Sequence, residues 1–118
     1  MALAAGAWLG GQRSAVLMQS SGVGNCVNML SLWRSCGVAG LLVITMRGQF
    51  GEANPWQLPM GQITPEVLRL CGLVTFDVDD AARIAATVEA AATMVFKGGT
   101  ACAVAIGQRA IGAKGFAP

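Results

Sequence analysis

The sequence contains no histidine and no tyrosine, and only 12% of its 118 residues are charged. Without histidine, the chain cannot build a Ser-His-Asp or Cys-His nucleophile, nor a metal site with histidine ligands. Its eight basic and six acidic residues are scattered along the chain, so no basic cluster indicates nucleic-acid binding. Hydrophobic residues make up 54% of the sequence, which excludes intrinsic disorder and predicts a well-buried core. The length predicts one domain over residues 1–118.

The sequence also lacks a continuous apolar run long enough to cross a membrane. Residues 14–33 form the longest uncharged run, but Gln19, Ser20, Ser21 and Asn25 occupy its middle. A spanning helix needs about 20 predominantly apolar residues, so this run does not qualify. No basic residue precedes the apolar start of the chain, which argues against a secretory signal. We therefore expect a cytoplasmic protein that does not contact a membrane.

The four cysteines, Cys26, Cys36, Cys71 and Cys102, show no C-x-x-C spacing and lie within apolar stretches. This usage is typical of buried, free thiols in a reducing compartment. We expect no metal site.

Apolar segments of helical and strand character alternate along the chain. Helices are expected over residues 2–9, 25–36 and 65–71 and after Asp79 or Asp80, and strands over residues 15–18, 41–44, 74–78 and 102–106. A loop is expected from Arg47 to Thr64, with Thr64 as the N-cap of the next helix and Pro65 at its first position. This alternation predicts a three-layer α/β/α fold with a mostly parallel, doubly wound sheet.

The order of these elements predicts an incomplete sheet. The chain starts with a helix, which is unusual for a unit of this kind, and four strands make a small sheet. We expect the strand over residues 15–18 to have an unpaired, apolar edge. The chain alone is therefore expected to be poorly soluble or to form a hetero- or homo-oligomer.

Two segments that follow predicted strands are candidates for a binding site, because open α/β sheets bind ligands beyond the carboxyl ends of their strands. The first is the glycine-rich turn from Ser20 to Asn25, where glycine allows close approach and a helix N-terminus offers free N–H groups. The alternative is a tight turn that uses glycine for its geometry alone. Val27 breaks the G-x-G-x-x-G dinucleotide pattern, which counts against an ordinary nucleotide-binding domain.

The second segment is Thr45-Met46-Arg47-Gly48. An arginine that leaves a buried strand suits a carboxylate, phosphonate or sulfonate, because its guanidinium can form two parallel hydrogen bonds to such a group. The alternative is an Arg47 that pairs with Glu52 or with a helix end. The following loop places Trp56 among small and polar residues, as in a lid or an interface, although Trp56 could instead pack back on the sheet.

Three blocks carry a resemblance to a known family: AAGAWLGG at residues 4–11, AVLMQSSGVGN at 15–25 and LLVITMRGQFGEANPWQLPMG at 41–61. In this order they resemble the alpha, pyrimidine-binding subunit of the sulfopyruvate and phosphonopyruvate decarboxylases, which depend on thiamine diphosphate. The similarity covers most of residues 4–72. The remainder, to Ile106, fits the same fold but carries no motif of its own.

The resemblance implies a domain that holds the aminopyrimidine ring of thiamine diphosphate. A partner, the diphosphate-binding (beta) subunit or domain, would hold the diphosphate through Mg²⁺ and a G-D-G motif that this sequence lacks. The implied cofactor-binding residues are Ser20, Ser21, Gly22, Val23, Gly24 and Asn25. Arg47 matches an arginine of the family, and our hypothesis is that it binds the second anionic group of a small 2-oxo acid substrate.

The catalytic glutamate of the family lies in an E-E-G-like motif just ahead of the A-A-G-A block. This sequence starts at Met1, a few residues too late to contain it, and Glu52, Glu66 and Glu89 lie elsewhere. The strand-helix-strand that opens the family's domain is missing too, so no catalytic residue is assigned. We expect one subunit of a decarboxylase that is inactive alone. The alternative is a non-catalytic binding or structural module of the same fold.

Overall fold

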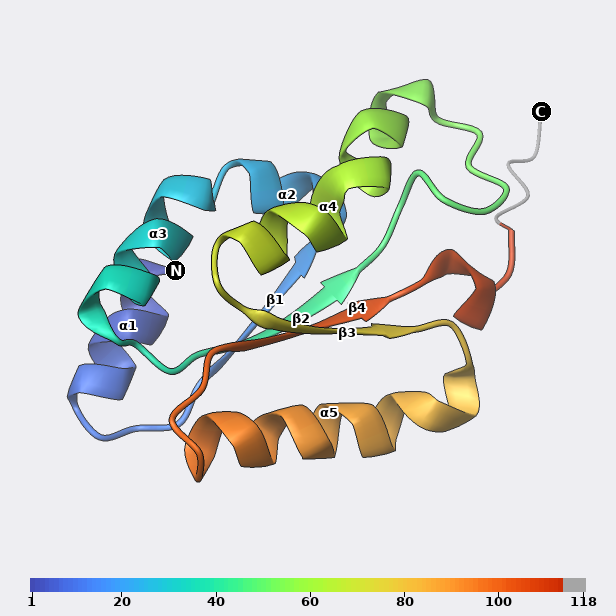
Figure 1. Cartoon of the computed structure of the whole chain (residues 1–118). Coiled ribbons are helices and arrows are strands. Elements are labelled where there is room, and N and C mark those ends of the chain that lie inside the picture. The colour runs from blue at the N-terminus through green and yellow to red at the C-terminus, as the bar shows by residue number, and fades with distance from the viewer. Residues whose placement is uncertain (114–118) are drawn as a thin grey trace.

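A computed structural model describes residues 1–113 and shows three layers, with a central sheet between helices (Figure 1). The strands are β1 (Ala15–Gln19), β2 (Leu41–Thr45), β3 (Val74–Val78) and β4 (Cys102–Ile106). They form one sheet in the order β1-β2-β4-β3, in which all neighbours are parallel. The predicted α/β fold class is confirmed.

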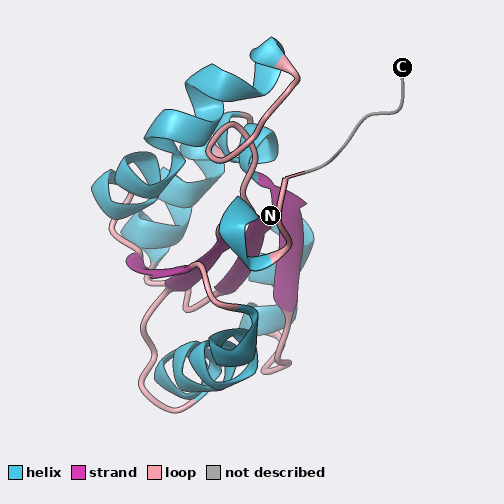
Figure 2. Ribbon diagram, turned by 90° about the vertical axis from the view of Figure 1, so that its right-hand side faces the viewer, coloured by secondary structure: helices cyan, strands magenta, loops and turns pink. Residues whose placement is uncertain are grey.

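Helices lie on both faces of this sheet, as the turned view shows (Figure 2). The helices are α1 (Ala2–Leu9), α2 (Ser20–Gly24), α3 (Val27–Cys36), α4 (Leu58–Leu70) and α5 (Ala81–Phe96), with 3-10 turns η1 (Pro55–Gln57) and η2 (Gln108–Ala110). Helices α3 and α4 pack on one face, and α5 packs on the other (Figure 1). Within residues 1–113, no helix combines the length and the apolar character needed to cross a bilayer.

Strand β2 separates two apolar cores, because successive side chains of a strand point to opposite faces. Leu42 and Ile44 belong to the core beneath α3 and α4. Leu41 belongs to the core above α5, and Val43 packs against that core. The prediction that residues 41–44 form a strand buried on both faces is therefore confirmed.

Helix α5 begins as its sequence indicates. Asp80, rather than Asp79, is the N-cap: its Oδ1 accepts a hydrogen bond of 2.9 Å from the N–H of Ala82. Its inward stripe, predicted at helical spacing, packs against the sheet through Ile84, Val88, Ala91 and Val95. A cap and an apolar stripe are both local signals, and here the tertiary structure agrees with them.

The predicted start of α4 is wrong, because the helix begins at Leu58. Thr64 is not an N-cap but lies inside the helix, where its Oγ1 donates a 2.6 Å hydrogen bond to the carbonyl of Met60. Pro65 also lies inside α4. The N-cap of α4 is Gln57, which makes no side-chain capping hydrogen bond. Asn54 caps the preceding η1 turn instead: its Oδ1 accepts from the N–H of Trp56 at 3.1 Å. The long predicted loop is therefore shorter than expected.

Two further expectations need correction. Helix α3 begins at Val27 rather than at residue 25, because the preceding segment forms the separate helix α2. All four cysteines are free, but Cys36 is exposed, and only Cys102 is fully buried. Burial raises the pKa of the Cys102 thiol.

The approach of α4 to the segment after β2 generates a prediction about Gly61. A Cβ at this position would lie 2.0 Å from the carbonyl oxygen of Arg47 and 2.6 Å from the Cα of Gly48. Both are backbone atoms that cannot move aside cheaply. We expect Gly61→Ala to lower the free energy of unfolding by about 1–3 kcal/mol, as overpacking does, in urea denaturation.

The matched control is Gly6→Ala in α1, where no atom lies within 4 Å of the added Cβ. Alanine favours a helix over glycine by about 0.5–1 kcal/mol, so this variant should be at least as stable as the original chain. Equal losses in the two variants would contradict the close packing at Gly61.

Candidate functional site

The carboxyl ends of the four parallel strands lie at one edge of the sheet. The connection after β2 leads to α4 on one face, whereas the connection after β3 leads to α5 on the other. Strand β4 lies between them. The connections from the strands on either side of β4 thus leave on opposite faces, which opens a crevice of the kind where open α/β sheets bind ligands.

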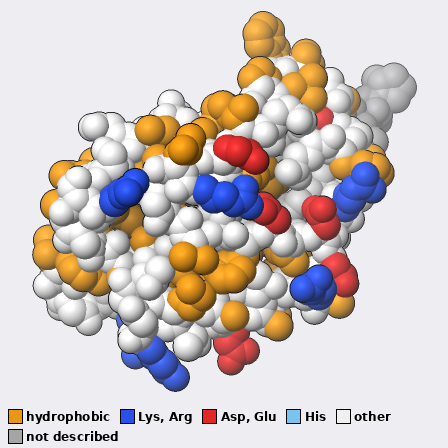
Figure 3. All heavy atoms as spheres, in the orientation of Figure 1, with side chains coloured by type: hydrophobic (Ala, Val, Ile, Leu, Met, Phe, Trp, Pro, Cys, Tyr) orange, Lys and Arg blue, Asp and Glu red, His pale blue; other side chains and the backbone are white. Residues whose placement is uncertain are grey.

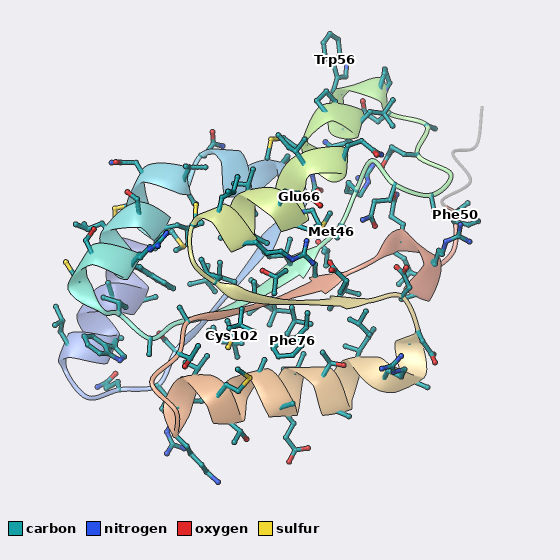
Figure 4. The ribbon with its side chains drawn as sticks, in the orientation of Figure 1. Met46, Phe50, Trp56, Glu66, Phe76 and Cys102 are labelled. Carbon is teal, nitrogen blue, oxygen red and sulfur yellow. The ribbon has the colours of Figure 1, made fainter. Side chains whose placement is uncertain are left out.

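A cavity of about 330 Å³ occupies this crevice. Its walls come from the segment after β2, from α4, and from the residues after β3 and β4: Gln49, Phe50, Gly61, Gln62, Pro65, Glu66, Asp79 and Arg109. Figure 4 shows Phe50 and Glu66 on opposite sides of this region. The guanidinium of Arg109 lies over the ring of Phe50, 4.3 Å from its centroid. Two carboxylates and one guanidinium give the lining an excess of negative charge.

No motif in the sequence predicted that these cavity residues form a site. A signal existed for two of them, because Asp79 follows β3 and Arg109 comes soon after β4. Gly61 and Gln62 of α4 carried no such signal, since the predicted helix began after them.

Arg47 and Glu52 form a bidentate ion pair next to this crevice. The Nε of Arg47 donates to Oε2 of Glu52 at 2.5 Å, and its Nη2 donates to Oε1 at 2.7 Å. The exposed fractions of the two side chains are 17% and 1%. Arg47 therefore pairs with Glu52, which was the alternative to an anion-binding role in the sequence. Nη1 of Arg47 donates to no acceptor within residues 1–113, and its binding of a substrate anion remains a prediction.

The Glu52 carboxylate accepts three further hydrogen bonds. The N–H of Asn54 donates at 2.9 Å, the N–H of Gly48 at 3.3 Å and Nε2 of Gln108 at 3.1 Å. The hydrogen bonds from Arg47, followed by that from Asn54, lower the pKa of Glu52 from 4.5 to about 2. The same contact with Glu52 raises the pKa of Arg47. Glu52 is therefore an anion at any physiological pH.

Gln108 ties the end of β4 to the segment after β2. Its Oε1 accepts the N–H of Gln49 at 2.7 Å and the N–H of Phe50 at 3.0 Å, while its Nε2 donates to Glu52. The side chain is buried. No pattern in the sequence singles out this glutamine, because the contact joins residues nearly sixty positions apart along the chain.

Within the predicted turn from Ser20 to Asn25, Ser20–Gly24 forms the short helix α2 and Asn25 is its C-cap. Ser20 and Val23 are fully buried. The Oγ of Ser20 accepts the N–H of Arg47 at 3.1 Å, and its carbonyl accepts from Oγ1 of Thr64 at 3.3 Å. Neither Gly22 nor Gly24 has a positive φ, so neither serves a left-handed turn. These contacts dock α2 onto the neighbouring segments.

Part of α2 nevertheless faces outward. Asn25 and Gly24 are exposed, and Ser21 is half-buried. The Nε2 of Gln19 donates to Oγ of Ser21 at 2.8 Å and to Oε1 of Gln57 at 2.9 Å, which joins the end of β1 to the start of α4. The crevice cavity does not include this segment in its lining. Cofactor binding by Ser20, Ser21, Gly22, Val23, Gly24 and Asn25 remains a prediction.

Trp56 projects from the η1 turn, away from the rest of the molecule (Figure 4). Its exposed fraction is 86%. Packing of Trp56 back onto the sheet, which the sequence left open, is therefore wrong. In the part of the chain that the structure describes, no three Cys, Asp or Glu side chains lie close enough together to hold a metal ion.

Comparison with known proteins confirms the predicted resemblance. The chain is 40% identical over 75 residues to sulfopyruvate decarboxylase subunit alpha of Methanocaldococcus jannaschii, covering 63% of this chain and 44% of that protein. It is 42% identical over 69 residues to the subunit of the same name in Methanothermobacter thermautotrophicus, covering 58% and 42%. Phosphonopyruvate decarboxylase of Streptomyces viridochromogenes is 42% identical over 74 residues, covering 61% and 19%.

These proteins are homologues of the chain. The chain spans less than half the length of each of them. No protein-family model matches it.

The contacts of Glu52 predict how stability depends on pH. The pKa of Glu52 falls from 4.5 to about 2 on folding, so its contribution is present above pH 4.5 and is lost as the pH falls toward 2. We expect the midpoint of urea unfolding to decrease over this range, and Glu52→Gln to remove most of that decrease.

Glu66→Gln is the control, because Glu66 lies on the exposed side of α4. It should keep the acid-dependent decrease. If Glu52→Gln retained the same decrease as the original chain, the buried pair would not be its source.

Proposed function

We propose that the chain is one component of a decarboxylase that acts on a small 2-oxo acid with a second anionic group. The similarity to two alpha subunits, at 40% and 42% identity, carries this proposal. Those relatives are named as sulfopyruvate decarboxylase subunits, and other relatives as phosphonopyruvate decarboxylase. Their name as alpha subunits implies a partner subunit.

Arg47 is the cation that we propose for the second anionic group of the substrate. Glu52 uses only the Nε and Nη2 of its guanidinium. The remaining Nη1 can donate to a sulfonate or phosphonate oxygen, and the ion pair with Glu52 fixes the orientation of the guanidinium plane. The crevice cavity is a poorer place for a dianion, because Glu66 and Asp79 line it.

We propose thiamine diphosphate as the cofactor, on the resemblance described above. When bound, it supplies an electron sink for the carbanion that decarboxylation leaves. The described residues do not fit the proton-transfer role at its pyrimidine ring. Glu52 already accepts five hydrogen bonds, and Glu66 and Asp79 belong to a cavity that α2 does not line. No step of cofactor activation is assigned to this chain.

The contribution proposed for this chain is a wall of the cofactor site. The outward side of α2, with Ser21, Gly24 and Asn25, would face the aminopyrimidine ring. A partner subunit would hold the diphosphate and Mg²⁺.

A second candidate function is a non-catalytic module of the same fold. The saturation of polar groups at the carboxyl edge favours it. The side chains of Ser20, Glu52 and Gln108 all form hydrogen bonds with neighbouring segments. Such a module would join a partner without adding a reacting group.

Calorimetric titration with thiamine diphosphate and Mg²⁺ distinguishes the two functions. The chain alone should give no binding heat. Together with a diphosphate-binding subunit, it should bind thiamine diphosphate and release CO₂ from sulfopyruvate or phosphonopyruvate. Cofactor binding without CO₂ release would support the module, and failure to form any complex would contradict both.

Kinetics of Arg47→Ala in the assembled enzyme test the proposed anion contact. Loss of a charged hydrogen bond of about 1.5–3 kcal/mol should raise KM about 10- to 100-fold, with a smaller effect on kcat. Unchanged KM and kcat would remove Arg47 from the site. Arg69→Ala is the control, because Arg69 pairs with Asp77 at the far edge of the sheet and should leave both constants unchanged.

A further inference from the structure

The crevice cavity is lined by residues between Gln49 and Arg109, which are positioned by the neighbouring strands β2, β4 and β3. In Figure 3, acidic and basic side chains lie near one another on the right-hand part of the molecule, where the strands of Figure 1 end. The cavity volume of about 330 Å³ is at the small end of the range of about 300–1,000 Å³ for ligand pockets. The cavity therefore suits a small ligand.

Asp79 supplies a negative charge to this cavity. It directly follows β3, and its carboxylate rests against Gly107, where a Cβ would overlap with Oδ1 of Asp79. The φ of Gly107 is −68°, so its backbone conformation does not require glycine, and the room that the carboxylate needs explains the residue. Asp79 takes part in none of the ion pairs within residues 1–113.

Arg109 supplies a positive charge to the same lining. Its guanidinium lies over the ring of Phe50, and the backbone N–H of Phe50 is held by Oε1 of the buried Gln108. Stacking uses the face of the guanidinium and leaves the N–H groups at its edges free to donate. In the described part of the chain, Arg109 forms no ion pair, not even with Asp79, although both line one cavity.

Glu66, the third charged residue of the lining, already has a cation beside it. Its Oε1 lies 3.7 Å from Nη1 of Arg69. The two remaining charges, those of Asp79 and Arg109, have opposite signs. A simple cation would leave Arg109 without a counterion, and an anion would leave Asp79 without one. A ligand that carries both an ammonium and a carboxylate group can pair with the two residues at once, through charge-assisted hydrogen bonds.

We propose that the crevice cavity binds a small α-amino acid with an uncharged side chain, in its zwitterionic form. The ammonium group donates to the carboxylate of Asp79, and the ligand carboxylate accepts from the guanidinium of Arg109. The side chain of the ligand packs on the apolar part of the lining, which includes Phe50 and Pro65. This binding does not depend on the decarboxylase function proposed above.

Titration of the 118-residue chain with L-alanine, followed through the backbone amide chemical shifts, tests the proposal. The shifts of Gly61, in the lining, and of Gly107, beside Asp79, should change and saturate. For so small a ligand we expect a dissociation constant on the order of 1 mM. Asp79→Asn and Arg109→Gln each remove a charged hydrogen bond and should raise this constant at least about tenfold.

Glu89→Gln and Arg83→Gln are the matched controls, because both residues are exposed on α5 and neither lines the cavity. They should leave the dissociation constant unchanged. The amide spectrum of each variant also shows whether that variant folds. Equal weakening by the cavity variants and the control variants would overturn the proposal.

Two analogues test whether the site requires both charges. N-acetyl-L-alanine lacks the ammonium group and L-alaninamide lacks the carboxylate, so each should bind at least about tenfold more weakly than L-alanine. Equal binding of either analogue would overturn the proposal, because it would indicate a site for an anion or for a cation alone. Amide shifts that do not saturate with L-alanine would overturn it as well.

Discussion

The carboxylate of Glu52, buried beside the end of β2, holds the carboxyl edge of the sheet together. It accepts hydrogen bonds from Arg47 and from the N–H groups of Gly48 and Asn54 in its own segment, and from Gln108 beyond β4. A buried carboxylate is costly unless such donors surround it, so the backbone must follow the path that supplies them. This path sets the entry into η1 and α4, and α4 forms one wall of the crevice cavity.

The same contacts limit the chemistry that the chain can perform. The Glu52 carboxylate accepts hydrogen bonds from five donors, which stabilise its charged form and lower its pKa. It is therefore a poor proton acceptor. Ser20 is similarly occupied by the N–H of Arg47. What remains available is the unused Nη1 of Arg47 and the outward side of α2. These groups suit the binding and orientation of a ligand.

The asymmetry of the sheet edges complements this picture. The ion pair between Arg69 and Asp77 lies at β3, whereas β1 and α1 present apolar side chains. Within the part of the chain that the structure describes, the two edge strands therefore differ in the side chains that they present to solvent.

Local patterns in the sequence determined the strands and most helices, including the bounds of β3 and β4 and the apolar stripe of α5, because short apolar runs and caps act over a few residues. The family resemblance was equally local. Only the tertiary structure decided that α4 begins at Leu58, ahead of Thr64, that Ser20 is buried, and that Gln108 meets Glu52. Those outcomes depend on contacts between segments far apart in the chain, which no local pattern encodes.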